Sequence, residues 1–244
     1  MNELSQLLMD VTPAVEFGWI GRAYVFVLLV IVPFLALLQP DDRELDLPPR
    51  GALYTSAVVG ISVLAVFTVL VLVLEDVSLS AVGLHGTSVG RFVFWTVFTV
   101  VGALAGDFVI SRAAQRLGIR ESRLTYHLMP RNRRDMWAFM GVSASAGFGE
   151  ELTYHGFLLA GLTAWLGNGF LAALVANLAF GVLHGYQGQA GVIRGFVMGY
   201  LFCLPVITGA GLLPAMVGHF LVNALLGLGA WKWMVPAEER ARLL

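Results

Sequence analysis

Long apolar stretches are the feature that most constrains what this chain can fold into. A helix needs about 20 mostly apolar residues to cross the hydrocarbon core of a bilayer. Of the 244 residues, 58% are hydrophobic and only 13% are charged, and the mean hydropathy is +0.79. About a quarter of the residues in a soluble domain are charged, so the surface of this chain suits lipid better than water.

The apolar stretches predict an all-α protein, a polytopic bundle of about seven transmembrane helices. The predicted spans cover about residues 19–38, 52–74, 91–110, 135–162, 170–185, 191–207 and 213–231. Glycine-containing turns separate the last three spans. Small residues let helices approach closely in lipid, so we expect a compact bundle.

One segment between the third and fourth predicted spans concentrates positive charge. It holds Arg112, Arg116, Arg120, Arg123, Arg131, Arg133 and Arg134. Arginine and lysine in short loops favour the cytoplasmic side, so we place this segment in the cytoplasm. Counting spans from there puts the N-terminus outside and the C-terminus, with Arg240 and Arg242, inside. The chain has fourteen Arg and one Lys, a bias that fits a GC-rich bacterium, so we expect the bacterial inner membrane.

Polar residues inside the later spans are the main functional candidates. They are Glu150, Glu151 and His155 in the fourth span, His184 in the fifth, and His219 and Asn223 in the seventh. A charged side chain at mid-bilayer costs about 2.5–3.5 kcal/mol on insertion scales, so such residues usually mark function. Three pairs are four residues apart, namely Glu151 and His155, Phe180 and His184, and His219 and Asn223. Residues at this spacing share a helix face, so the three helices can direct these side chains to one point.

A site of this kind contains the groups that hydrolysis by water requires. A carboxylate takes a proton from water, an imidazole donates or accepts protons, and an N–H group stabilises an oxyanion. An ion or proton pathway uses the same residue types, so an ion-coupled transporter is an alternative. The sequence has no internal repeat, which counts against that alternative. It also has no basic domain or phosphate-binding glycine loop, so we expect no nucleic-acid partner.

Three short motifs resemble those of one known family. The stretch GEELTYHG at 149–156 resembles E-E-x-x-x-R followed by a small residue, FGVLH at 180–184 resembles F-x-x-x-H, and HFLVN at 219–223 resembles H-x-x-x-N. In this order, and inside hydrophobic segments, they are similar to the CPBP family. That family includes type II CAAX prenyl endopeptidases, bacteriocin self-immunity proteins and related bacterial intramembrane proteases. We therefore expect residues 136–244 to form a CAAX-endopeptidase-like catalytic core. Residues 1–135 supply the N-terminal spans and the basic segment, in one membrane domain.

The resemblance implies a glutamate-dependent intramembrane endopeptidase. By matched position, Glu150 is the general base that activates water, and His184 holds or activates that water. His219 and Asn223 form the oxyanion site, with Glu151 as a supporting carboxylate. The expected substrate is a membrane-associated protein or peptide, cut near a C-terminal sorting, anchor or CAAX-type segment.

The chain departs from the first motif at His155, where the family has Arg. Arginine is permanently charged and binds carboxylates with two donors, whereas histidine is smaller and can be neutral. We hypothesise that Arg194, the one arginine of the sixth predicted span, compensates by pairing with Glu151. The alternative is that Arg194 extends to the cytoplasmic interface.

Two further questions stay open at the level of sequence. The first is the cofactor: we expect none because the helical zinc signature H-E-x-x-H is absent, but Glu150, His184 and His219 could form a zinc site. The second is whether the protein is catalytic at all. The replacement of Arg by His155 favours the alternative of a non-catalytic family member that acts as an immunity or scaffold membrane protein.

Overall fold

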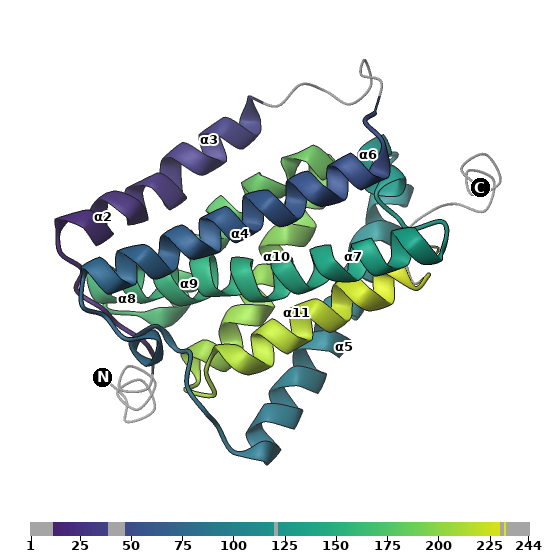
Figure 1. The fold of residues 1–244 in the computed structure, drawn as a ribbon. Helices are drawn as coiled ribbons and strands as arrows, with labels where there is room; N and C mark the ends of the chain where they lie inside the picture. The colour runs from purple at the N-terminus through teal and green to yellow at the C-terminus, as the bar shows by residue number, and fades with distance from the viewer. Residues whose placement is uncertain (1–11, 39–46, 120–121, 230–231, 233–244) are drawn as a thin grey trace.

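The described part of the chain is built from helices. A computed structural model describes residues 12–38, 47–119, 122–229 and 232. Within these residues all regular structure is helical, and most helices run along one another as a bundle (Figure 1). The prediction of an all-α membrane bundle is confirmed, because five helices are long and apolar enough to cross a membrane.

The helices follow one another with short connections. The first half consists of α2 (Trp19–Phe26), η1 (Val27–Ile31), α3 (Val32–Leu37), α4 (Arg50–Leu74), η2 (Leu79–Val82), α5 (Val89–Arg116) and α6 (Arg123–His127). The second half consists of α7 (Arg133–Ser145), η3 (Ala146–Leu158), α8 (Leu159–Leu166), α9 (Gly169–Leu183), η4 (His184–Gln187), α10 (Gln189–Ile207) and α11 (Leu212–Gly227).

Side-chain caps fix where several helices begin. The side chains of Ser88, Ser122, Asn132 and Asn168 each accept a backbone N–H from the first turn of α5, α6, α7 and α9, respectively. A Ser or Asn at this position satisfies a donor that the helix itself leaves unpaired. The polar residues between the apolar stretches therefore mark helix starts.

The described residues contain five candidate spans, fewer than the seven predicted. The five candidate spans are 19–37, 50–74, 89–116, 169–187 and 189–207. Helix α11 is apolar but has only 16 residues, and Trp231, the predicted end of its span, lies outside the described residues. The continuous helix α7–η3–α8 is not among the five. It carries Arg133, Asp135 and both candidate glutamates, which lower its hydropathy. Seven spans remain a prediction.

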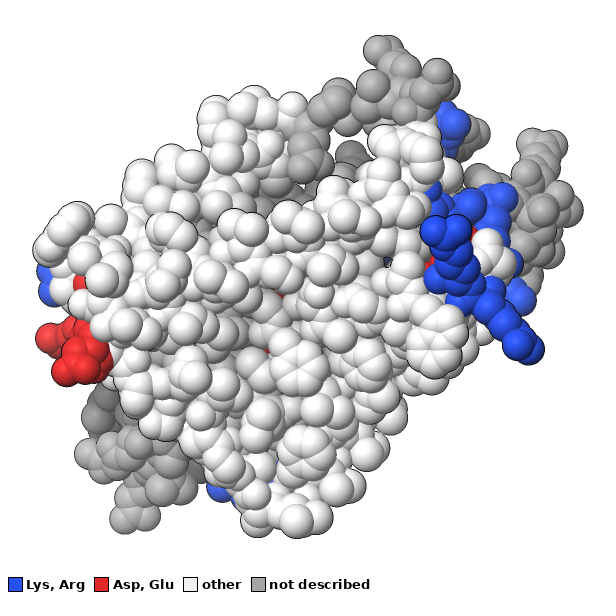
Figure 2. Space-filling view, in the orientation of Figure 1, with Lys and Arg blue, Asp and Glu red and all other residues white. Residues whose placement is uncertain are grey.

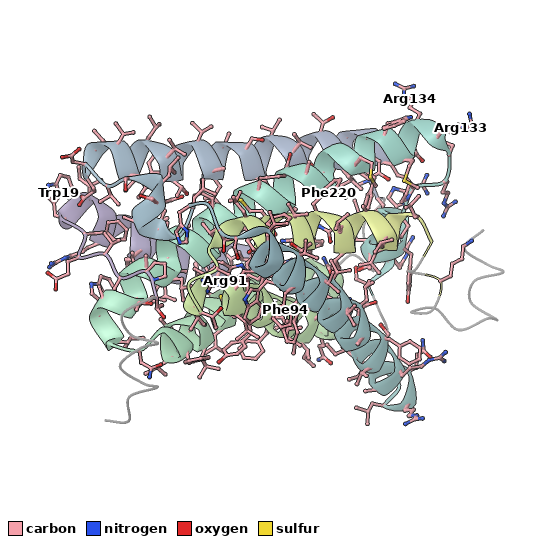
Figure 3. The ribbon with its side chains drawn as sticks, turned by 90° about the horizontal axis from the view of Figure 1, so that it is seen from below. Trp19, Arg91, Phe94, Arg133, Arg134 and Phe220 are labelled. Carbon is pink, nitrogen blue, oxygen red and sulfur yellow. The ribbon has the colours of Figure 1, made fainter. Side chains whose placement is uncertain are left out.

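The two ends of the molecule carry different charged side chains. Figure 2 shows most of the Lys and Arg side chains gathered at the end where α7 begins, acidic side chains at the opposite end, and apolar surface between them. Viewed from below, Arg133 and Arg134 lie at one end and Trp19 at the other (Figure 3). The basic end is the one that we predict to face the cytoplasm. Arg120, Arg240 and Arg242 lie outside the described residues.

The N-terminal helices and the later helices share one core. The ring of Phe17 stacks on that of Phe157 with centroids 4.3 Å apart. A chain of hydroxyl groups runs from Tyr24 through Thr68 to Thr153, with both oxygen–oxygen distances at 3.0 Å. These contacts join α2 and α4 to η3. The N-terminal helices of the protein therefore also hold the segment that carries the two candidate glutamates.

Glycine allows α11 to approach η3 closely. A Cβ atom on Gly147 would lie 2.8 Å from the carbonyl oxygen of Met216 and 2.9 Å from the amide nitrogen of Phe220. Contacts this short are too close for any side chain, so the two backbones touch only because residue 147 is glycine. This contact brings His219 of α11 beside the glutamates of η3.

Candidate active site

The two adjacent glutamates of η3 point to different environments. Glu150 is half-buried and lines a cavity of about 190 Å³ together with His184, His219 and Asn223. Glu151 is completely buried beside this cavity. The segment η3 is a wide π-helix of 13 residues, a conformation that is rare and is often found at functional sites. The structure therefore brings the four predicted catalytic residues to one cavity.

Glu151 is hydrogen-bonded to two histidines. One carboxylate oxygen lies 2.7 Å from Nδ1 of His155, on the next turn of η3. The other lies 2.7 Å from Nδ1 of His219, on α11. The ring of His219 also stacks on Phe202, with centroids 4.9 Å apart and planes at 11°. Glu151 and Phe202 thus fix the position of the His219 ring at the wall of the cavity.

His184 is oriented by the backbone of its own helix. Its Nδ1 lies 2.9 Å from the carbonyl oxygen of Phe180, and a ring nitrogen that faces a carbonyl must donate a proton to it. The rings of Phe180 and His184 meet edge to face at 4.7 Å. Helix α10 packs directly against the imidazole, because a Cβ on Gly195 would lie 2.8 Å from Nδ1. With Nδ1 bound to the carbonyl, Nε2 is the nitrogen left for chemistry in the cavity.

Asn177 is a buried polar residue that the sequence analysis missed. Its Oδ1 lies 3.0 Å from Nε2 of His155, so His155 has a partner on both ring nitrogens. The signal was available, since Asn177 is an amide in the middle of a predicted span. Asn177 belongs to none of the three motifs, however, and its partner His155 is on another helix.

Arg194 is not placed as predicted. Instead of pairing with Glu151, its Nε lies 2.6 Å from Oδ1 of Asp107 on α5, and its Nη2 donates to Ser111 at 3.3 Å. Arg194 is only 4% exposed, so it does not extend to the interface either. Asp107, which the sequence analysis also missed, is a single acid within a predicted span. A buried guanidinium needs a counterion, and Asp107 of α5 is the counterion of Arg194 in place of Glu151.

The rest of the cavity wall is mostly apolar. Ile61 of α4, Phe139 of α7 and Leu226 of α11 lie along it. Leu128 and Met129, which follow the short helix α6, line the same cavity.

Helix α4 holds the last residue of α6 and the residue after it by two hydrogen bonds to their backbone carbonyls. The hydroxyl of Tyr54 donates to the carbonyl oxygen of Leu128 at 2.8 Å, and Nε of Arg50 donates to that of His127 at 2.7 Å. These hydrogen bonds hold in place the part of the cavity wall that Leu128 and Met129 form.

A metal site does not form from the predicted ligands. Among the described residues, no three His, Cys, Asp or Glu side chains are grouped so that they could hold a metal ion. Glu151 and Nδ1 of His219 are engaged with each other, and Nδ1 of His184 is engaged with a backbone carbonyl. These contacts leave Nε2 of His184 and Nε2 of His219 toward the cavity, which is also how a histidine that binds a metal is usually held.

Comparison with known proteins supports the resemblance seen in the motifs. Residues 132–225 match a protein family described as type II CAAX prenyl endopeptidase Rce1-like. Searches of curated proteins and of solved structures found no match to the chain. The matched segment includes both glutamates, His155, His184, His219 and Asn223. The segment that carries the predicted site therefore matches the model of a protease family, the type II CAAX prenyl endopeptidase Rce1-like family, in agreement with the resemblance to the CPBP family.

Proposed function

We propose that the protein is a glutamate-dependent intramembrane endopeptidase that hydrolyses a membrane-associated protein or peptide near a C-terminal sorting, anchor or CAAX-type segment. The observation that carries the proposal is the convergence of Glu150, His184, His219 and Asn223 on one cavity. These residues come from three separate helical segments, and the rest of the cavity is lined mostly by apolar side chains. The family match, to a family of proteases, supports the same reaction class.

In the proposed reaction Glu150 is the general base. Its carboxylate takes a proton from a water molecule in the cavity, and the resulting hydroxide attacks the carbonyl carbon of the scissile peptide bond. The tetrahedral intermediate then collapses as the proton passes from Glu150 to the leaving amine. Ser143 also lines the cavity, but its hydroxyl donates to the carbonyl oxygen of Phe139, so we assign it no role as a nucleophile.

The histidines have separate proposed roles that follow from their hydrogen bonds. His184 donates its Nδ1–H to Phe180, so its Nε2 accepts a hydrogen bond from the attacking water and orients it. His219 uses its Nδ1–H for Glu151, so it can donate from Nε2 only when both nitrogens are protonated. As an oxyanion donor His219 is therefore an imidazolium, with the amide of Asn223 as the second donor.

The apolar wall suggests the kind of substrate. Side chains such as Ile61, Phe139 and Leu226 suit an apolar segment or a lipid-modified end of a protein better than a soluble, charged peptide. Five helices of the described residues are long and apolar enough to cross a membrane, which fits a substrate that is itself at the membrane. We propose that no metal takes part.

The proposed function is tested in cells by mapping protein termini. Membrane proteins are compared between strains that express the wild type or Glu150→Ala at equal levels, and new C-termini are identified by mass spectrometry. C-termini that require Glu150 establish proteolysis and identify the substrate. If a deletion phenotype is rescued equally by both proteins and no terminus differs, the protein acts as a scaffold or immunity protein instead.

A further inference from the structure

Asn177 lies at the end of a buried chain of hydrogen bonds that leads to the cavity. The chain runs from Asn177 on α9 to His155 and Glu151 on η3, and then to His219 on α11. Asn177, His155 and Glu151 are fully buried, and His219 is 6% exposed. Of these residues only His219 lines the cavity, so the other three act on the reaction through it.

The orientation of the Asn177 amide is fixed by its surroundings. Its Nδ2 donates to the carbonyl oxygen of Ala173 at 2.8 Å and to Sγ of Cys203 at 3.3 Å. A carbonyl oxygen accepts only from a donor, so the nitrogen must face Ala173 and the oxygen must face His155. The amide also presses on α10, because a Cβ on Gly199 would lie 2.0 Å from Oδ1. Asn177 therefore cannot turn away, and Nε2 of His155 must donate to it.

The same proton counting fixes the remaining members. One proton lies between Nδ1 of His155 and Glu151, whichever of the two atoms holds it. While the second oxygen of Glu151 carries no proton it is an acceptor, and His219 then donates its Nδ1–H to it. Nε2 of His219 is left toward the cavity. Asn177 thus acts through His155 and Glu151 on how the ring of His219 is held.

We propose that Asn177 is a positioning residue for the hydrolysis, and that Asn177 and His155 together fill the place of the arginine that the first motif has at position 155. This inference rests on the proposed function. His155 gives Glu151 one hydrogen-bond partner, and Asn177 binds the far side of the imidazole. Together the two side chains take up the space that the longer arginine side chain would occupy. The His155 ring is further enclosed by Phe180, with centroids 5.0 Å apart.

The proposal predicts an unusual pattern in a double-mutant cycle. Asn177→Ala removes the acceptor and frees His155 to turn, so kcat falls about ten- to a hundredfold while KM changes little. His155→Arg alone has no space, because Asn177 already lies 3.0 Å from the imidazole, so kcat falls as well. In the double variant the guanidinium occupies the space of the amide and binds Glu151, and kcat recovers at least about tenfold over either single variant.

A matched control separates positioning from general loss of stability. Thr153→Val removes a hydrogen bond that is equally buried on η3 but that leads to Thr68 of α4, away from the cavity. This variant should lower the melting temperature with kcat within about threefold of wild type. All variants are assayed in membranes on the product that depends on Glu150.

Two results would overturn the proposal while the proposed function stands. If the wild type makes Glu150-dependent product and Asn177→Ala keeps the kcat of the Thr153→Val control, Asn177 has no positioning role. If the double variant is as impaired as the two single losses multiplied together, Asn177 and His155 do not jointly fill the place of the arginine. If the wild type makes no product that depends on Glu150, the proposed function itself is wrong and this inference falls with it.

Discussion

The contact of α11 with η3 at Gly147 gives a prediction that links the fold to the chemistry. A methyl group at residue 147 would lie 2.8 Å from the carbonyl oxygen of Met216, whereas an ordinary contact is at least 3.4 Å. In Gly147→Ala the two helices must therefore separate by about 0.6 Å, which is above the tolerance of about 0.5 Å for a catalytic arrangement. The displacement acts on the 2.7 Å hydrogen bond between Glu151 and His219.

We expect two measurable effects of Gly147→Ala. Overpacking of a tight contact costs about 1–3 kcal/mol, so the melting temperature in detergent should fall by several degrees. Displacement of His219 should lower kcat about tenfold or more. The cleavage assay uses the substrate identified by terminus mapping.

Gly141 provides the matched control, because it lies on α7 of the same continuous helix and a Cβ there meets no atom within 4 Å. Gly141→Ala should keep full activity and gain up to about 1 kcal/mol from helix propensity. If Gly147→Ala matches Gly141→Ala in both melting temperature and kcat, the close contact does not position His219, and the reasoning is refuted.

Three further predictions concern the buried ion pair, the metal and the topology. Asp107→Asn leaves the guanidinium of Arg194 buried without the carboxylate that lies 2.6 Å from it, so the free energy of unfolding should fall by about 3–5 kcal/mol. Adding Arg194→Gln should recover most of this loss. An unchanged melting temperature in Asp107→Asn would contradict the prediction. Strong chelators should leave the cleavage rate of the purified protein unchanged, whereas loss of activity that zinc restores would show a metalloprotease. A reporter fused after Leu244 should read as cytoplasmic, and an extracytoplasmic reading would reject the predicted topology.

The motif residues could be predicted from the sequence because their spacing is local. Glu151 and His155 are four positions apart and do form a hydrogen bond, as expected from a shared helix face. The same spacing orients His184 through the backbone at Phe180. Apolar length and composition likewise predicted where the first two spans lie. The candidate spans at 19–37 and 50–74 begin and end within two residues of the expected 19–38 and 52–74.

The contacts between distant helices could not be predicted in this way. The partner of Arg194 is on α5 and the partner of His155 is on α9, and neither Asp107 nor Asn177 belongs to a motif. Both are single polar residues in apolar runs, which shows that they are unusual but does not show what they bind. The choice between partners depends on which helices pack together, and close approaches at residues such as Gly147 decide that.

The central claim, that Glu150 activates the water that cleaves a membrane-associated substrate, is tested most directly with purified protein in liposomes. The cleavage rate of wild type is compared with that of Glu150→Gln, with Glu16→Gln at an exposed glutamate as the control and melting temperatures measured for all three. We predict that Glu150→Gln keeps its melting temperature and loses about 10²–10⁴-fold in rate, while Glu16→Gln stays at the wild-type rate. A folded Glu150→Gln protein that cleaves within a few-fold of wild type would contradict the account.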